Sequence, residues 1–225
     1  MCGCSRVADA AILTAIYDGY DIPKAAVPQQ GIDAEWVLVT DDPSIPDGWL
    51  GWRVIYAPQP GIAPIRAAKH PKFCPWEYTD APVSVWIDGS CQVRSATFAA
   101  DVLAYADPLA QFVSPDRDCI YDEAAVSLTI PKYAGEPIAE QAGCYRAAGH
   151  PEHWGMWVAT VIARRHTDQV EALGEAWTAE VEKWSFEDQI SQPVVLRNLG
   201  LTPATIPGYY RVNQWFELVA SGKHW

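Results

Sequence analysis

The stretch Pro82-Val83-Ser84-Val85-Trp86-Ile87-Asp88-Gly89-Ser90 joins a short apolar, β-branched run to a carboxylate, a glycine and a hydroxyl. A run of this length between Pro82 and Gly89 favours a strand over a helix. In open α/β sheets, ligands bind beyond the carboxyl ends of the strands, where a carboxylate can meet a metal ion or a phosphate. Asp-Gly is also a common turn dipeptide, and on this segment alone a turn is the more frequent outcome. The stretch therefore predicts a buried strand that brings Asp88 to a ligand site or to a simple turn.

Strand-like and helix-like segments alternate along the rest of the chain. Apolar runs bounded by turn residues predict strands at 11–16, 36–40, 52–56, 110–113 and 156–163. Apolar spacing of three and four residues predicts helices at 95–106, 121–128, 137–149 and 168–184. The proline-rich segment 58–82 is expected to be irregular or briefly helical. This alternation predicts an α/β fold.

The composition is that of a globular protein. The chain has 225 residues, of which 49% are hydrophobic and 20% charged, which excludes a disordered or collagen-like chain. We expect one domain over residues 1–225, with a mobile N-terminus at 1–10 and a C-terminal segment, 191–225, that wraps the domain. Eleven Trp and ten Tyr are numerous; they supply core volume or, as in sugar-binding clefts, flat rings that pack against apolar C–H faces.

The formal charge of −12 makes nucleic-acid binding through the phosphate backbone unfavourable, because that affinity comes mainly from Lys and Arg. Two local basic clusters remain: Arg164-Arg165-His166, and Arg66 with Lys69 and Lys72. Each could hold a small phosphorylated ligand, and each could equally be a solvated surface.

The six cysteines predict a reducing compartment. No signal peptide precedes them, and scattered cysteines in a cytoplasmic chain are usually reduced and buried. Cys2-x-Cys4 lacks a second pair at zinc-site spacing. No apolar run approaches the length of a membrane span, so we expect a cytoplasmic protein.

Further polar residues stand at the ends of predicted elements. Asp188 and the amide Gln189 follow the helix predicted at 168–184. Arg117 and Glu123 could bracket a hydroxylated ligand, or form an ion pair at a helix end. Gln141 and Tyr145 are four residues apart and share one helix face.

Seven short motifs follow one another along the chain: Thr14-Ala15-Ile16-Tyr17-Asp18-Gly19-Tyr20-Asp21, Arg66-x-x-Lys69-x-x-Lys72, Trp86-Ile87-Asp88-Gly89-Ser90, Arg117-Asp118-Cys119-Ile120-Tyr121-Asp122-Glu123-Ala124, Gln141-x-x-x-Tyr145, Val161-Ile162-x-Arg164-Arg165-His166 and Trp184-Ser185-x-x-Asp188-Gln189-Ile190-Ser191. Taken in this order, they resemble the TOD/MUCI-type glycosyltransferase-like proteins of plants and their bacterial and phage relatives. Each motif alone is weakly specific, and their common order makes the resemblance specific from about residue 12 to 191.

The resemblance implies a GT-A-like, Rossmann-type α/β sandwich with a mixed, mostly parallel central sheet flanked by helices. It implies a nucleotide-diphosphate sugar at the strand ends, with a divalent cation, Mn²⁺ or Mg²⁺, at Asp88 and His166. It also implies a catalytic role for Asp188 and Gln189 and acceptor or sugar contacts from Arg117, Glu123, Gln141 and Tyr145. The donor-binding residues that it implies are Thr14, Ala15, Tyr17, Asp18, Arg66, Lys69, Lys72, Asp88, Gly89, Ser90 and Arg164.

The activity implied by the resemblance is transfer of a hexosyl or pentosyl group to a hydroxyl acceptor, expected to be a carbohydrate. Two positions depart from the family pattern: Ser90 replaces the second acid of the usual two-acid motif, and Ser114-Pro115-Asp116 stands where relatives tend to carry a histidine. With one carboxylate, Lys69, Lys72 or Arg164 could supply the positive charge instead of a metal. Two alternatives stay open: a non-catalytic nucleotide-sugar or carbohydrate-binding module, and a glycosyltransferase acting on a modified base in DNA.

Overall fold

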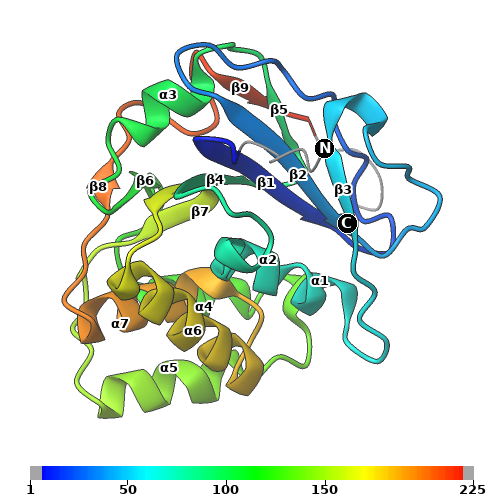
Figure 1. Ribbon diagram of the computed structural model, residues 1–225. Helices are drawn as coiled ribbons and strands as arrows, with labels where there is room; N and C mark the ends of the chain where they lie inside the picture. Colours follow the sequence, from blue (N-terminus) through cyan, green and yellow to red (C-terminus); the bar gives the residue numbers. More distant parts are fainter. Residues whose placement is uncertain (1–6, 220–225) are drawn as a thin grey trace.

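A seven-stranded sheet in the order β3-β2-β1-β4-β7-β6-β8 forms the centre of the computed structural model, which describes residues 7–219 (Figure 1). Among these strands, only β7 runs antiparallel to its neighbours, so the sheet is mixed and mostly parallel. The strands are β1 (Ala10–Ile16), β2 (Ala34–Thr40), β3 (Arg53–Tyr56), β4 (Val83–Ile87), β6 (Leu109–Val113), β7 (Trp157–Arg165) and β8 (Ala204–Thr205).

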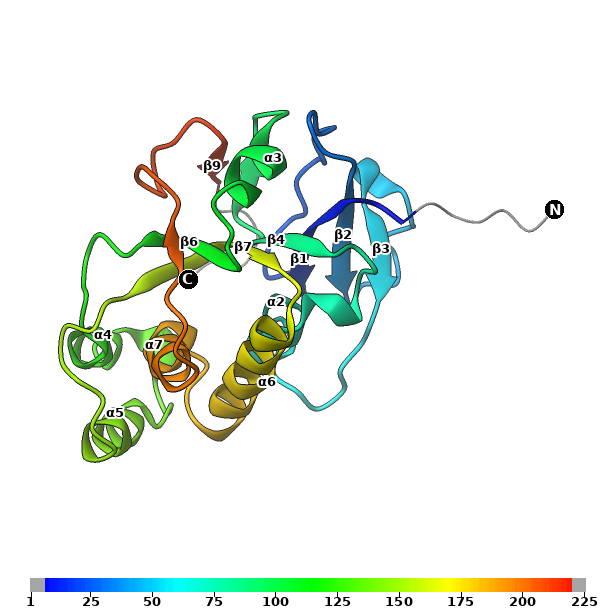
Figure 2. The ribbon, with the colours of Figure 1, turned by 60° about the vertical axis from the view of Figure 1, so that its left-hand side comes forward.

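Most helices cover one face of this sheet, and a smaller layer covers the other (Figures 1 and 2). The smaller layer is α3 (Phe98–Leu103) with the antiparallel pair β5 (Cys91–Val93) and β9 (Phe216–Leu218). Separate apolar clusters fill the space on the two faces. The helices of the larger layer are α1 (Pro64–Ala67), α2 (Lys69–Phe73), α4 (Ile120–Ser127), α5 (Ile138–Ala147), α6 (Asp168–Lys183) and α7 (Asp188–Asn198), with short 3₁₀ turns η2 (Pro75–Glu77) and η3 (Pro131–Tyr133) beside them and η1 (Trp49–Gly51) before β3.

The strand order reverses between β1 and β4. The chain passes from β1 outward to β2 and β3, then returns through α1 and α2 to place β4 on the other side of β1. All residues of β1 are buried, as expected for a central parallel strand. Crevices at such a reversal, beyond the carboxyl ends of the strands, are where open α/β sheets bind ligands.

The helix α2 packs very closely on α6. Gly174 of α6 is buried, and a Cβ atom at this position would lie 2.4 Å from the Phe73 carbonyl oxygen and 2.5 Å from the Trp76 ring. The absence of a side chain at Gly174 therefore permits the contact between α2 and α6.

The fold agrees with the predicted α/β class, and each predicted strand is present within two residues of its predicted ends. The helix predicted at 95–106 is three residues shorter at each end. Within the segment expected to wrap the domain, 191–225, residues up to Asn198 instead complete helix α7; beyond it the chain crosses to β8 and β9. Of the segment 1–10, residues 1–6, including Cys2 and Cys4, lie outside the described residues, whereas Ala10 is fully buried in β1.

Most of the tryptophans belong to the core. The buried ones are Trp36, Trp52, Trp86, Trp157, Trp177, Trp184 and Trp215. Among the helices of residues 7–219, none combines the length and apolarity needed to cross a membrane.

Candidate functional site

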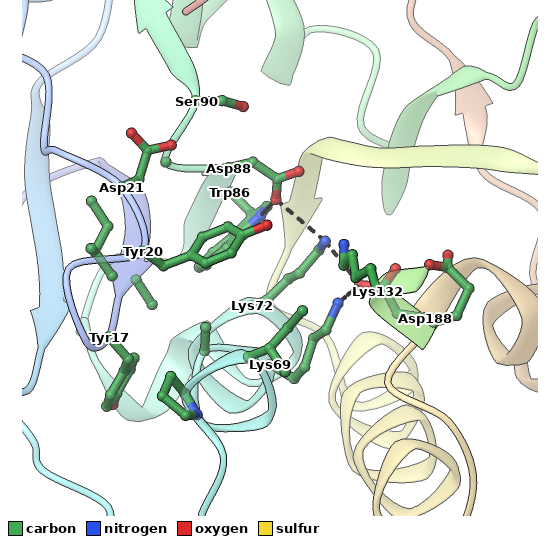
Figure 3. Close-up of a pocket in the computed structure, with 17 residues that line it drawn as sticks. Tyr17, Tyr20, Asp21, Lys69, Lys72, Trp86, Asp88, Ser90, Lys132 and Asp188 are labelled. Atoms are coloured by element: carbon green, nitrogen blue, oxygen red, sulfur yellow. Dashed lines mark hydrogen bonds and ion pairs between the residues drawn. The ribbon is translucent and has the colours of Figure 1, made fainter. Parts of the chain in front are cut away.

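A cavity of about 250 Å³ opens at the reversal between β1 and β4. The ends of β1 and β4 form one wall, α2 forms the floor, and the start of α7 closes the opposite side (Figure 3). The cavity is lined by Ala15, Ile16, Tyr17, Tyr20, Asp21, Pro64, Ile65, Ala68, Lys69, Lys72, Trp86, Asp88, Gly89, Ser90, Lys132, Glu187 and Asp188.

Alternating charges connect the two sides of this cavity (Figure 3). The Lys72 ammonium lies 3.3 Å from Asp88 Oδ1 and 2.9 Å from Asp188 Oδ2. Lys69 Nζ donates to the same oxygen of Asp188 at 2.8 Å. Trp86 Nε1 donates to Asp88 Oδ1 at 2.9 Å, which fixes the carboxylate at the end of β4. Lys72 thus bridges two carboxylates that are 100 residues apart in the chain.

The surroundings of these groups shift their pKa values in different directions. Burial opposes ionisation of Asp188, yet the charges of Lys69 and Lys72 outweigh it and hold the pKa of this carboxyl well below its ordinary value. Burial lowers the pKa of Lys72, but Asp188 and Asp88 more than compensate and raise it overall. For Lys69 burial prevails, and its pKa is lowered. Lys69 and Lys72 therefore favour the ionised form of the Asp188 carboxyl.

The pKa of Glu187, next to Asp188, is shifted in the opposite direction. Its side chain is buried and lines the cavity, and its carboxylate contacts the Tyr133 hydroxyl and accepts a hydrogen bond from Gln189 N at 3.3 Å. Burial, followed by the neighbouring charge of Asp188, raises the pKa of Glu187. Two adjacent carboxyls therefore have pKa values that are pushed apart.

The predicted acceptor residues Gln141 and Tyr145 do not line the cavity; both are buried beneath the loop that leads into α7. Gln141 Oε1 accepts hydrogen bonds from Ser185 Oγ at 2.6 Å and Ser185 N at 3.3 Å. Gln141 Nε2 donates to the Tyr145 hydroxyl, as their shared helix face predicts, and that hydroxyl donates to Glu180. Their place corrects the prediction: they support the loop rather than contact a sugar.

Arg66 also supports this loop. Its guanidinium donates to the Val181 and Trp184 carbonyls at the end of α6, and to Glu136 at 2.6 Å. Glu136 in turn accepts from Phe186 N at 2.9 Å. Because these carbonyls and Glu136 occupy its donors, Arg66 does not reach the cavity as the donor-binding prediction required.

Arg164 is buried behind α2 rather than exposed to a ligand. Its guanidinium donates to the Lys72 carbonyl at 2.8 Å and to the Phe73 carbonyl at 3.2 Å. These are unsatisfied carbonyls at the end of a short helix, which cations stabilise. Arg164 was predicted to contact the donor; it holds in place the helix that carries Lys69 and Lys72.

His166 lies at the other end of β4 from Asp88. β7 pairs with β4 antiparallel, and His166 N donates to the Pro82 carbonyl while its ring contacts Ser84 Oγ at 2.8 Å. Asp88 stands six residues after Pro82 along the extended chain, which spans on the order of 20 Å. The predicted pairing of Asp88 and His166 around one metal ion is therefore wrong.

The remaining predicted residues divide between the cavity wall and its surroundings. Ala15, Tyr17, Gly89 and Ser90 line the cavity. Thr14 is buried in β1, and Asp18 is exposed beyond it, where its backbone N–H donates to Asp41. These positions correct the prediction that both contact the donor.

Arg117 and Glu123 form an ion pair at 2.5 Å outside the cavity lining. This ion pair is the alternative that the sequence left open. Gln189 likewise does not line the cavity, although its backbone N–H fixes Glu187.

Four lining residues with ionisable side chains were not predicted as site residues: Tyr20, Asp21, Lys132 and Glu187. Asp21 and Tyr20 close the first motif, just beyond the end of β1, so their place after a strand was the signal. Asp21 is buried and bonded to Lys24, and a Cβ atom on Gly89 would lie 3.1 Å from its Cβ. The tight fit between Gly89 and Asp21 brings the loops after β1 and β4 together.

The cavity offers oxygen ligands for a hard cation. Trp86 and Lys72 both contact Oδ1 of Asp88, and no hydrogen bond from the described side chains reaches Oδ2. Asp21 and the Ser90 hydroxyl line the same end of the cavity (Figure 3). Mg²⁺ is commonly held by one or two carboxylates together with substrate phosphates, so this set fits such an ion. Asp21 is a second carboxylate in this lining, next to Asp88 and Ser90.

Comparison with known proteins gives the family. The family model described as "TOD1/MUCI70, glycosyltransferase-like domain" matches residues 40–224, which begins after the first of the motifs above. The chain therefore belongs to the TOD1/MUCI70 glycosyltransferase-like family, as the motif order predicted. A search of curated proteins gives no match. The predicted GT-A-type sandwich agrees with the strand order and the mostly parallel sheet.

Solved structures show more distant similarity. A bifunctional glycosyltransferase, WbbM, is 12% identical with a TM-score of 0.47, covering 92% of this chain and 40% of the other. The chain thus spans about two fifths of that protein's length. The galactosyltransferase LgtC, in complex with donor and acceptor sugar analogues, is 11% identical with a TM-score of 0.42, covering 82% and 70% of the two chains. A CMP-2-keto-3-deoxy-manno-octonic acid synthetase complexed with CTP is 13% identical with a TM-score of 0.36, covering 88% and 89%.

Proposed function

We propose that this chain transfers a sugar from a nucleotide-diphosphate sugar to a hydroxyl acceptor, with the cavity at the β1–β4 reversal as its donor site. The observation that carries the proposal is the row of Asp88, Lys72 and Asp188 across that cavity. Ligand sites of open α/β sheets lie at such reversals, and family membership supplies the reaction class.

The two lysines of α2 suit a diphosphate. Lys72 keeps its charge because two carboxylates raise its pKa, and Lys69 lies beside it on the same face. Cations near the departing diphosphate stabilise the negative charge that develops there as the glycosidic C–O bond breaks. Lys132, exposed on η3 at the rim, adds a third cation to the lining.

A divalent cation, when bound, would supply further positive charge at the diphosphate. Asp88 and Asp21 are the residues that would hold it, because they are the carboxylates at the strand-end wall. In the proposed division of roles, Asp88 anchors the phosphate end of the donor, and the Trp86 indole keeps its carboxylate oriented.

We assign the role of general base, which takes the proton of the acceptor hydroxyl, to Glu187 rather than to Asp188. A general base works best with a pKa close to the working pH. The pKa of Glu187 is raised, whereas Asp188 is bound by two lysines and its pKa is lowered. The acceptor oxygen would form the new C–O bond while its proton moves to Glu187. Asp188 then acts as a positioning residue that holds Lys69 and Lys72.

Thermal-shift titration with nucleotide-diphosphate sugars, with and without Mn²⁺, tests the donor site. We expect one class of nucleotide sugar to raise the Tm, and Lys72→Met to abolish the effect. A matched control is Arg53→Met, whose exposed ion pair with Glu35 lies far from the cavity lining. No response to any donor would remove the proposed donor site.

Transfer and donor hydrolysis assays then test the chemistry. Glu187→Gln should retain donor binding and lower turnover at least tenfold, while the acidic limb of the pH–rate profile disappears. Unchanged turnover would mean that a residue other than Glu187 acts as the general base. Donor binding with neither transfer nor hydrolysis would instead favour a non-catalytic sugar-nucleotide module.

A further inference from the structure

A second cluster of chemically active side chains lies on the side of α2 opposite the donor cavity. His70, Cys74 and Glu77 each offer one ligand atom, and these atoms all lie within 4.8 Å of one another. His70 and Cys74 are four residues apart and therefore share one face of the helical turn. Lys69 and Lys72, three residues apart, share the face that lines the donor cavity.

One distance within the cluster matches that expected between two ligands of a tetrahedral metal site. His70 Nε2 lies 3.6 Å from Glu77 Oε1, near the ~3.4 Å between two ligands with bonds of ~2.0–2.1 Å to one zinc ion. The other ring nitrogen, Nδ1, contacts the Tyr78 hydroxyl at 3.0 Å. A second partner of this kind orients the imidazole of metal-binding histidines. The ring is thus held with Nε2 toward Glu77.

We propose that His70, Cys74 and Glu77 bind a divalent ion of borderline softness, Zn²⁺. Nitrogen, thiolate and carboxylate ligands together suit zinc better than Mg²⁺ or Mn²⁺, which prefer oxygen alone. Three protein ligands leave a fourth position for water. His70 and Tyr78 also line a cavity of about 550 Å³.

A bound ion would stabilise the helix that forms the floor of the donor cavity. Helix α2 has five residues and no side-chain cap, and a helix so short is unstable alone. The ion would tie α2 to η2 through His70, Cys74 and Glu77, while Arg164 binds the carbonyls at the end of α2. The bound ion would thus fix the position of Lys69 and Lys72 without contacting the donor.

Titration with Co²⁺, which replaces zinc and gives a thiolate-to-metal absorption band, tests the ligand set without any sugar. Wild-type protein should show the band at one equivalent, and Cys74→Ser should lose it. Cys119→Ser is the matched control, because Cys119 belongs to the other described cluster, with Asp122 and His153. A Cys2→Ser, Cys4→Ser double variant controls for the N-terminal thiols. Absence of the band in wild type, or its persistence in Cys74→Ser, overturns the proposal.

Thermal shifts with Zn²⁺ provide a second, independent measurement. An ion that binds only the folded state raises the Tm. We expect this rise in wild type and in Asp88→Asn, and its loss in His70→Asn. An equal rise in His70→Asn contradicts the site, whatever the outcome of the donor titrations, because no nucleotide sugar is present.

Discussion

Asp88 and Asp188 contact the same lysine from opposite sides of the cavity, but the chain positions them in different ways. Asp88 stands at the end of a central strand, with its side chain 36% exposed and fixed by a tryptophan two residues earlier. Asp188 is 7% exposed and begins a helix that is held by side chains from α2 and α6, after a loop that is held by a side chain from α5. One carboxylate is placed by local structure and the other by tertiary contacts.

The difference teaches which carboxylate belongs to the ligand and which to the protein. An accessible carboxylate at a strand end can exchange its partner for a ligand or a hydrated ion. A buried one between two ammonium groups is fixed by its partners, because losing either leaves a charge buried without compensation. We therefore expect changes at Asp188 to affect stability, and changes at Asp88 to affect binding.

The largest effect is expected from Asp188→Asn. This change leaves Lys69 buried without its carboxylate and Lys72 with Asp88 alone. Removing one partner of a buried ion pair costs about 3–5 kcal/mol, so the free energy of unfolding should fall by that amount. Urea denaturation monitored by tryptophan fluorescence measures it. A loss below about 1 kcal/mol would mean that the ion pairs of Asp188 stabilise the fold no more than the partly exposed ion pair of Asp88 does.

The pH dependence of stability should separate Asp188 from its neighbour Glu187. The folded-state pKa of Asp188 is lowered, so its contribution is present above the unfolded value, about 4, and is lost as the pH falls further. On the order of 2 kcal/mol should disappear between pH 4 and pH 2 in wild type and not in Asp188→Asn.

The pH dependence of stability that Glu187 contributes has the opposite sign. Its folded-state pKa is raised, so the stability that it contributes is present below its unfolded value, about 4.3, and is lost as the pH rises. Glu187→Gln should therefore be more stable than wild type above pH 5. Denaturation curves from pH 2 to 8 that coincide for the two variants would contradict both assignments.

Gln141→Leu tests the network beneath the loop. It removes the acceptor of Ser185 N and Oγ and one partner of Tyr145, leaving buried polar groups unsatisfied. We expect a loss of about 1–3 kcal/mol in unfolding free energy, with turnover reduced more than donor affinity. If Gln141 contacted the acceptor instead, KM for the acceptor would rise while stability stayed constant.

The smallest effect on stability is expected from Asp88→Asn. Its carboxylate is partly exposed, and exposed or half-exposed ion pairs contribute at most about 1 kcal/mol. The unfolding free energy should change by less than this, whereas any increase in Tm caused by Mn²⁺ with a nucleotide sugar should be lost. Loss of stability equal to that of Asp188→Asn would erase the distinction between the two carboxylates.

The sequence was sufficient for the features that depend on neighbours along the chain. Apolar runs and turn residues located the strands, and the end of a central strand located Asp88. Asp21, at the end of the first motif, follows the same rule, because it stands beyond the end of β1 and lines the cavity. Helix α7 was missed because Pro193 lies within it, although the helix accommodates this proline.

The sequence could not show what the selected residues contact. Lys69 and Asp188 are 119 residues apart, and Arg66 and Glu136 are 70 apart, so each pairing depends on how whole helices pack. Arg164 and His166 follow an apolar strand as Asp88 does, but β7 runs antiparallel and carries them to the opposite edge. The predictions for Arg164 and His166 failed because hydrophobic periodicity does not reveal the direction of a strand.

Gly174 extends the same reasoning to a residue that never touches the cavity. Because it lacks a Cβ atom, α6 allows the Phe73 carbonyl to approach as closely as two backbones can. That approach sets the position of α2, which forms the cavity floor. It therefore also sets how far the ammonium groups of Lys69 and Lys72 extend into the cavity. The absence of a side chain at Gly174 therefore sets the depth of the cavity from the side of α2 that faces α6. Any side chain at this position would push α2 toward the cavity and make the cavity shallower.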